Sequence, residues 1–549
     1  RAARWFEAQG DVDRAVHHAL LAGDANLAAR IVETAGGWRR IYATTRGGAT
    51  LFQALSARAS EIDLVRFPLV TLGLSIFNAK AAQLAAANHY LVIAERAAAG
   101  DAILAKDLRV VRILLALYTD HWASSADLSA LEDDLRQPDG MELIHRALAL
   151  NMLSYNFLIR SELDRALHYG HQATRAFRDG GADFGAMHLY THVGQAFFLS
   201  GDCASALSSY EELISEAQAN IGSGSDFDAV GQVLKAEVLS MRGEVDVAAE
   251  ILKWALPHLE LHDTWFDLLA AGFMAEQRVL RMREDLLAAH AAMDRIRAVA
   301  RRRGFDRLTR LIDGERAMLL MGSGDLDQAI RHAEASGFGM QAIVSDRANT
   351  LAIHLRGATP AIFWTRAYLA LGEKAKAREV FDQFRTRQAQ RPHVPRTIEL
   401  TLIEMAILLA EGRADLAAAR LSDLVLTMPL GDYRALLHLD YSTGLDELRT
   451  LANHQSVANL TRKRLQSLLV TGEPAQEQAA EDGAYVFTGR ERMVLELLSS
   501  GLSNKEIGRR LALSDNTIKF HLRNIFGKLN VSTRTAAVTA ARQKGMLNR

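Results

Sequence analysis

The sequence is poor in the residues that mark secreted or irregular proteins. Its 549 residues include one cysteine, Cys203, and 8 prolines. A single cysteine excludes an intramolecular disulfide framework and a multi-cysteine zinc site, and it is typical of a reducing cytosol, so we expect a cytoplasmic protein. Hydrophobic residues make up 49% and charged residues 23% of the chain. This composition predicts a mostly helical globular protein and excludes the collagen-like and disordered classes.

Long apolar runs and phosphate-binding loops are missing as well. No Gly-x-x-x-x-Gly-Lys-Ser/Thr loop occurs, and no paired carboxylates or nucleophile elbow stand in a convincing context. We therefore expect no enzyme activity and no cofactor bound by this chain. The richest apolar segment, residues 70–87, also predicts no membrane span, because five polar side chains interrupt it. They are Thr71, Ser75, Asn78, Lys80 and Gln83.

Charge is distributed unevenly along the chain. Residues 485–549 contain 12 Lys or Arg and 4 Asp or Glu, a net charge of +8, whereas the whole chain is −1 and the first 484 residues are therefore −9. Residues 472–484 are acidic and have little periodic apolar content, which predicts a flexible linker. A basic tail behind a linker predicts a polyanion-binding module attached to a body that controls it. The alternative is a fluctuation of surface charge.

A hexad, Gly-Asp/Glu-x-x-x-Ala, recurs through the acidic body. Intact and degenerate copies follow one another at spacings of 40, 42, 40, 41, 48 and 40 residues, beginning at Ser161, Gly201, Gly243, Arg283, Gly324, Gly372 and Gly412. Glycine can end one helix in the left-handed conformation, the acid can begin the next, and alanine permits close packing. This period, with apolar residues at 3.6-residue intervals, predicts a solenoid of antiparallel helix pairs over residues 41–471.

The first 40 residues depart from this period, because hexads at Gly10 and Gly23 are only 13 residues apart. Two segments, Trp5-Phe6-Glu7-Ala8-Gln9-Gly10-Asp11 and Ala15-Val16-His17-His18-Ala19-Leu20, resemble the start of the helical array in large ATP-dependent LuxR-type (STAND) regulators, the maltose-regulon-activator group in particular. The resemblance implies that residues 1–40 lead into a tetratricopeptide-like superhelix. It also implies that an ATP-binding module and a winged helix precede Arg1, so we expect the chain to be part of a longer protein.

The basic tail has the helix boundaries of a four-helix domain. Ser/Thr-x-x-Glu capping boxes at residues 488–491 and 503–506 begin two helices. Gly501 ends the first of them. A third helix is predicted over residues 514–529 and a fourth over about 532–545. The fold class we expect is therefore all-α throughout, a helical-hairpin superhelix followed by four helices.

The predicted third helix has two contrasting faces. At 100° per residue, a stripe within roughly 60° should be buried, and it comprises Ile518, Leu522, Ile525 and Leu529. The opposite face carries two cations, two amides and one aromatic ring, from Asn516, Lys519, Phe520, Arg523 and Asn524. Such a helix fits the DNA major groove, where long donors read base edges. The alternative is an ordinary solvated basic helix.

Four motifs of the tail resemble the output domain of LuxR-type and response regulators: Thr488-x-x-Glu491, Gly501-Leu502-Ser503-Asn504-Lys505-Glu506-Ile507, Thr517-Ile518-Lys519-x-His521 and Lys528-Leu529-x-Val531-x-x-Arg534. The resemblance implies a helix-turn-helix over residues 485–549 that binds double-stranded DNA, with a dimer interface on its fourth helix. Base-reading positions would be Lys519, Phe520 and Arg523, flanked by Asn516 and Asn524. Phosphate contacts would come from Asn504, Lys505, Thr517, His521 and Arg534. Gly508 and Asn530 depart from the pattern, where alanine and glycine are usual.

The sequence gives fewer indications of binding sites in the body than in the tail. Two histidine pairs share a helix face at spacing i, i+4, but no third ligand is placed by the sequence, so we expect no metal site. They are His188 with His192, and His258 with His262. Aromatic side chains could line a ligand groove or form the core between repeats. The candidates for a groove are Trp265, Phe266, Trp364 and Tyr368.

Together these observations predict a DNA-binding transcription regulator whose superhelix senses a small-molecule inducer or a protein effector. The resemblance implies that the inducer favours self-association, and that the protein activates transcription, with RNA polymerase as a further partner. One alternative is a protein-docking scaffold whose partner masks or presents the DNA-binding domain. Another is a regulator whose longer parent is chiefly an ATPase.

Overall fold

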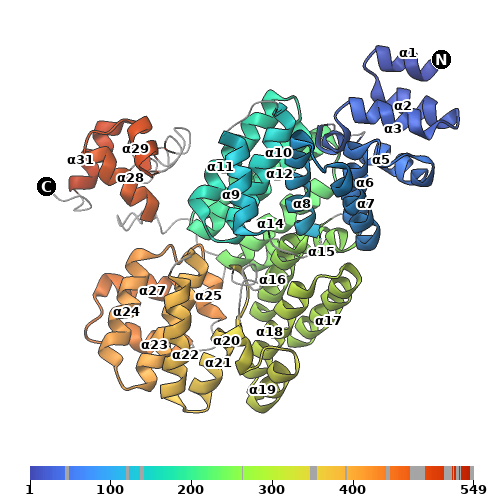
Figure 1. Cartoon of the computed structure of the whole chain (residues 1–549). Helices are drawn as coiled ribbons and strands as arrows, with labels where there is room; N and C mark the ends of the chain where they lie inside the picture. The colour runs from blue at the N-terminus through green and yellow to red at the C-terminus, as the bar shows by residue number, and fades with distance from the viewer. Residues whose placement is uncertain are drawn as a thin grey trace.

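The computed structural model describes residues 1–43, 48–118, 123–136, 141–262, 264–345, 355–389, 392–439, 445–469, 489–511 and 533–543, together with the separate positions 518, 522, 525, 526, 529 and 531. Every regular element within these residues is a helix (Figure 1), which confirms the all-α fold class. None of the helices described is both long and apolar enough to cross a lipid bilayer.

The first helices are short, as the closely spaced hexads require. Asp11 and Asp24 cap α2 and α3, since their carboxylates accept from the amides of Arg14 and Leu27 at 3.1 and 2.8 Å. Up to residue 136 the helices are α1 (Ala2–Ala8), α2 (Val12–Leu21), α3 (Ala25–Thr34), η1 (Gly37–Arg39), α4 (Arg40–Ala43), α5 (Gly48–Ser56), η2 (Ala59–Glu61), α6 (Pro68–Lys80), α7 (Leu84–Ala97), α8 (Ala102–Tyr118) and α9 (Ser125–Arg136).

Antiparallel helix pairs follow, as the 40-residue period predicts. The pairs are α10 (Leu143–Ile159) with α11 (Leu163–Asp179), α12 (Asp183–Ser200) with α13 (Cys203–Asn220), α14 (Asp226–Arg242) with α15 (Val245–Leu261), α16 (Phe266–Met282) with α17 (Leu286–Arg303), and α18 (Asp306–Gly322) with α19 (Leu326–Ala335). The first helix of each pair is buried on more sides than the second, so it carries the core of the array.

Each hexad forms the turn between the two helices of a pair. The glycines at 201, 243, 324, 372 and 412 have φ between 76° and 94°, the left-handed conformation that only glycine adopts without strain. The alanines that end these hexads are fully buried. At one copy the predicted register is wrong by one residue, since the left-handed residue is Glu284 and the buried alanine is Ala289. A copy that the sequence pattern missed begins at Ala82, whose φ is 59°.

A second group of helices packs back against the first (Figure 1). It comprises α20 (Met340–Ser345), α21 (Pro360–Ala370), α22 (Lys374–Gln388), α23 (Val394–Ala410), α24 (Ala414–Thr427), α25 (Arg434–His438), α26 (Leu445–Ala452) and α27 (Asn459–Leu468). α25 contacts both α14 and α16. The Tyr433 hydroxyl donates to the carbonyl of Phe198, and the two rings stack with centroids 5.6 Å apart. The array therefore closes on itself instead of remaining an open superhelix.

Candidate nucleic-acid interface

A small separate core holds the basic tail together. α28 (Gly489–Ser499) packs against α29 (Asn504–Leu511) and α31 (Arg534–Gln543). The core is made entirely from side chains between residues 494 and 541, namely Val494, Leu495, Leu498, Ile507, Ile518, Leu522, Ile525, Leu529, Ala537 and Ala541. The tail thus has its own hydrophobic core, distinct from those of the repeats.

The turn between α28 and α29 has the predicted geometry. Gly501 follows α28 with φ of 81°. At the start of α29, the amide of Glu506 donates to the Ser503 hydroxyl at 3.3 Å, and the amide of Ser503 donates to the Glu506 carboxylate at 2.7 Å. These reciprocal bonds are the capping box expected from the sequence. α29 also continues through Gly508, so this departure from the usual alanine does not interrupt the helix.

The buried stripe of the predicted third helix is confirmed. Ile518 and Ile525 are fully buried, and Leu522 and Leu529 are 6% and 4% exposed. All four have helical backbone. Seven predicted DNA-contacting residues lie outside the described part of the chain, and their roles stay predictions. They are Asn516, Thr517, Lys519, Phe520, His521, Arg523 and Asn524.

Three predicted phosphate contacts gather at the start of α29. Arg534, the first residue of α31, donates from Nη1 to Asn504 Oδ1 at 3.2 Å and from Nη2 to the carbonyl of Leu502. Lys505 is exposed beside them. The first amides of a helix point outward without intrahelical partners and favour an anion, and a lysine and an arginine add positive charge there. Chemically, this corner can hold a phosphate, although the Glu506 carboxylate already accepts the Ser503 amide.

The predicted groove residues of the repeat domain are separated. Trp265 and Phe266 lie in the main core of the repeats, with the Arg307 guanidinium 4.4 Å above the centre of the Phe266 ring. Trp364 lies in a second core and donates from Nε1 to the carbonyl of Phe338 at 2.9 Å. Tyr368 packs on that second core. This packing agrees with the alternative interpretation, in which the aromatic side chains form the core between repeats. Ligand binding by these residues stays a prediction.

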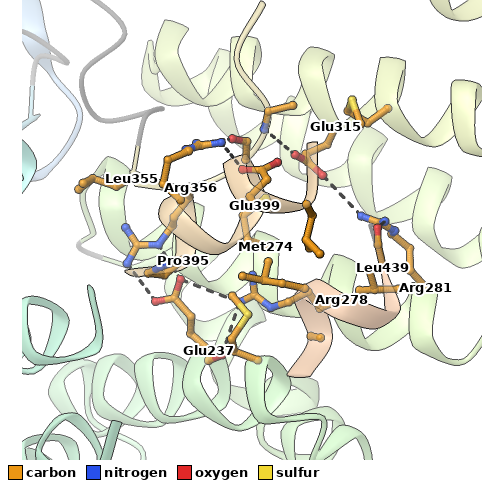
Figure 2. Close-up of a pocket in the computed structure, with 18 of the residues that line it drawn as sticks. Glu237, Met274, Arg278, Arg281, Glu315, Leu355, Arg356, Pro395, Glu399 and Leu439 are labelled. Carbon is orange, nitrogen blue, oxygen red and sulfur yellow. Dashed lines mark hydrogen bonds and ion pairs between the residues drawn. The ribbon is translucent and has the colours of Figure 1, made fainter. Parts of the chain in front are cut away.

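A cavity that the sequence did not reveal lies elsewhere in the repeat domain (Figure 2). Its volume is about 110 Å³, and its walls come from α14, α16, α18, α21, α23 and α25 and from residues 355–358. None of the four aromatic groove candidates lines it. The one sign of it in the sequence is the 48-residue spacing between the hexads at Gly324 and Gly372, eight residues longer than the period, because residues 355–358 of the cavity wall lie in this unit.

The histidine pairs also differ from one another. Burial lowers the pKa of His188 and of His192 to about 3, so both are neutral core residues. His258 and His262 lie at the surface with Asp226, which the sequence analysis did not connect to them, and potential ligand atoms of the three lie within 4.8 Å of one another. His258 Nε2 is 2.7 Å from Asp226 Oδ1. A hydrogen bond explains why His258 and Asp226 lie so close together. The absence of a metal site stays a prediction.

Comparison with known proteins agrees with the tail geometry. Residues 485–541 match the family described as bacterial regulatory proteins, luxR family. The chain is 51% identical over 59 residues to the nitrate/nitrite response regulator protein NarP of Escherichia coli, covering 11% of this chain and 27% of NarP. It is 43% identical over 60 residues to the HTH-type transcriptional regulator AlkS of Alcanivorax borkumensis, covering 11% of this chain and 7% of AlkS.

A longer match reaches into the repeats. The HTH-type transcriptional regulator MalT of Vibrio campbellii is 29% identical over 197 residues, covering 32% of this chain and 22% of MalT. The tail alone is too short to supply that share, so part of the match lies in the helical repeats. The chain spans about a quarter or less of each of these relatives. Residues 485–541 are thus a LuxR-type helix-turn-helix segment, and the resemblance to MalT-like regulators with helical repeats is confirmed.

Proposed function

We propose that this chain is the sensing and DNA-binding part of a transcriptional regulator, a binding protein and not an enzyme. The observation that carries the proposal is the burial of four side chains, those of Ile518, Leu522, Ile525 and Leu529. The basic face was predicted on the assumption that these four side chains face inward. The capping box of α29 and the family match over residues 485–541 support the same assignment.

Binding begins with phosphates and gains specificity from bases. The net charge of +8 on residues 485–549 attracts the DNA backbone, and each phosphate neutralised releases counterions. Lys505, Arg534 and the amides at the start of α29 orient the domain on one strand. Lys519 and Arg523, one helical turn apart in the sequence, then donate to base edges in the major groove.

The repeat domain would supply control. A signal bound by the repeats favours self-association, and two linked output domains then bind two half-sites with a raised effective concentration. We place this activity in the cytoplasm, where the regulator activates transcription and contacts RNA polymerase.

The test is a selection of bound duplexes from a random DNA library, followed by fluorescence anisotropy with a selected duplex and a scrambled one. We expect Lys519→Ala and Arg523→Ala each to cost about 1–3 kcal/mol on the selected duplex and less on the scrambled one. Thr517→Ala should weaken both duplexes alike. Lys505→Ala should reduce the slope of log K against log salt by about 0.9.

The matched control is Lys463→Ala, which removes an exposed cation from α27 outside the tail. It should change neither affinity nor salt slope. The proposal fails if the chain selects no duplex, and the assignment of roles fails if Lys519→Ala and Thr517→Ala have the same effect on both duplexes.

A further inference from the structure

The cavity of about 110 Å³ lies where the two groups of helices meet (Figure 2). α14, α16 and α18 of the first group form one side, and α21, α23 and α25 of the second group form the other. Residues 355–358 cross between them. A molecule bound here would therefore touch both groups at once.

The lining has more positive than negative side chains. Five arginines reach the cavity, namely Arg278, Arg281, Arg356, Arg366 and Arg396. Three carboxylates face them, from Glu237, Glu315 and Glu399. A fourth carboxylate, Asp267, lies behind Arg356 at 3.9 Å. Among the residues that line the cavity, arginines therefore outnumber carboxylates by five to three.

Two of the carboxylates bind arginines at close range, whereas Glu315 accepts from the Ala358 amide at 3.0 Å and lies 3.8 Å from Arg281. Glu237 binds Arg356 at 2.6 and 2.9 Å. Glu399 binds Arg396 and also lies 3.3 Å from Arg366. Arg396 makes a further bond, from Nη2 to the carbonyl of Gly357 at 2.7 Å. These contacts connect the segment 355–358 to α14 on one side of the cavity and to α23 on the other.

Arg278 is the side chain with the weakest compensation. Its nearest carboxylate is Glu237 at 3.9 Å, which Arg356 holds more closely. Its hydrogen bonds go instead to neutral acceptors, the Ser240 hydroxyl at 3.0 Å and the carbonyl of Glu237 at 3.5 Å. Burial lowers the pKa of Arg278 to about 10, so its charged form is disfavoured in this environment. An anion beside Arg278 would supply a negative charge at closer range.

Apart from His393, the rest of the lining is apolar. Met241, Met274 and Met318 approach from the first group of helices, and Leu402 and Leu436 approach from the second. Methionine fills irregular space and adapts to different shapes. The cavity is somewhat smaller than the ~150 Å³ engineered cavity that holds benzene. Such a volume suits a compact molecule of a few heavy atoms.

We propose that this cavity is a binding site for a small organic oxyanion, with its carboxylate or phosphate group on Arg278 and Arg281 and its apolar body against the methionines. Arginine suits this role because its guanidinium binds such groups through two parallel hydrogen bonds. Arg278 and Arg281 lie one turn apart on α16 and both face the cavity. Only the further step, that this ligand is the signal of the regulator, rests on the proposed function.

The test uses the full chain and three probes: acetate, butyrate and methyl phosphate, each against a neutral partner, acetamide, butyramide or methanol. Melting temperature is measured at constant ionic strength, and the dissociation constant is measured by titration calorimetry. We expect at least one anion to bind and to raise the melting temperature, whereas its neutral partner does not. A response to the carboxylates or to methyl phosphate identifies the head group.

Variants locate the site. Arg278→Gln should weaken binding of that anion about tenfold or more, because a charge-assisted hydrogen bond is lost. Glu399→Gln should strengthen binding about threefold or more, because it removes a like charge from the cavity, and a merely structural cluster would show no such gain. The matched control is Arg301→Gln, an exposed cation on α17, which should leave affinity unchanged.

The proposal is overturned if none of the anions binds, if the neutral partners bind equally well, or if Arg301→Gln weakens binding as much as Arg278→Gln. None of these measurements includes DNA. Failure here therefore leaves the DNA-binding proposal standing, and failure of the DNA experiments leaves this one standing.

Discussion

The buried ion pair of Arg356 with Glu237 offers a sharp test of how the repeat domain is closed. The two side chains are 4% and 1% exposed, and their separation along the sequence is 119 residues. Arg356 also donates to Gln195 Oε1 at 2.6 Å. We consider the change Arg356→Met, which keeps a flexible apolar stem but removes the charge and the five donors of the side chain.

The expected loss of stability follows from the buried charge that remains on Glu237. Removing one partner of a buried pair costs about 3–5 kcal/mol, because the other charge is left uncompensated. Here Glu237 would still have Arg278 at 3.9 Å, so we expect the lower end, about 3 kcal/mol. With an unfolding entropy of about 2.1 cal/mol/K per residue, a domain of roughly 470 residues melts about 3 °C lower for this loss.

A double variant separates the charge from the packing. Replacing a buried pair by apolar side chains of similar size is often nearly neutral. Arg356→Met with Glu237→Met should therefore recover at least half of the lost melting temperature, as followed by calorimetry. Arg301→Met, at an exposed position on α17, controls for the loss of one cation. The reasoning is refuted if Arg356→Met melts like the wild type, or if the double variant is no more stable than Arg356→Met alone.

Three further predictions follow from particular residues. Leu522→Ala should destabilise the tail by about 2–5 kcal/mol and abolish DNA binding while the melting of the repeat domain stays unchanged, because its core contains only residues of the tail. Gly201→Ala should lower the melting temperature more than Gly372→Ala. Both glycines have positive φ, but an added Cβ at 201 would lie 3.0 Å from Val394 Cγ2, whereas at 372 it meets no atom within 4 Å. Acidification from pH 7 to pH 5 should destabilise the repeat domain by about 1.4 kcal/mol per histidine for each pH unit below about 6.5. His188 and His192, with a native pKa of about 3, bind no proton there whereas the unfolded chain does, so His192→Leu should flatten the pH dependence of calorimetric stability.

Local features of this fold could be predicted because local residues determine them. A left-handed glycine, an acidic cap and a small buried residue lie within six positions, so each hexad specifies its turn without reference to the rest of the molecule. The stripe from Ile518 to Leu529 was predictable for the same reason, since four apolar residues at helical spacing have one face to bury. The error at Arg283 arose where neither residue 283 nor 284 is glycine.

The cavity could not be predicted, because contacts far apart in the sequence create it. Arg356 meets Gln195 across 161 residues, and Tyr433 meets Phe198 across 235. No periodicity links such positions. The sequence offered the aromatic residues either for a ligand groove or for the core between repeats, and the structure buries Phe266 and Trp364 in two separate cores.

The same closure connects the cavity, through α25, to the end of α27. Arg281, which lines the cavity from α16, donates to the carbonyl of Leu439 at 2.9 Å, just after α25. Arg434, the first residue of this short helix, donates to the carbonyl of Leu468 at 3.0 Å, and Nε2 of His438, the last residue, lies 3.0 Å from the same oxygen. Leu468 ends α27, the last repeat helix before the predicted linker. An anion that binds Arg281 in the cavity would compete with the Leu439 carbonyl for the N–H groups of Arg281. A ligand in the cavity would therefore change the contacts of α25, and through α25 those of Leu468, just before the predicted linker.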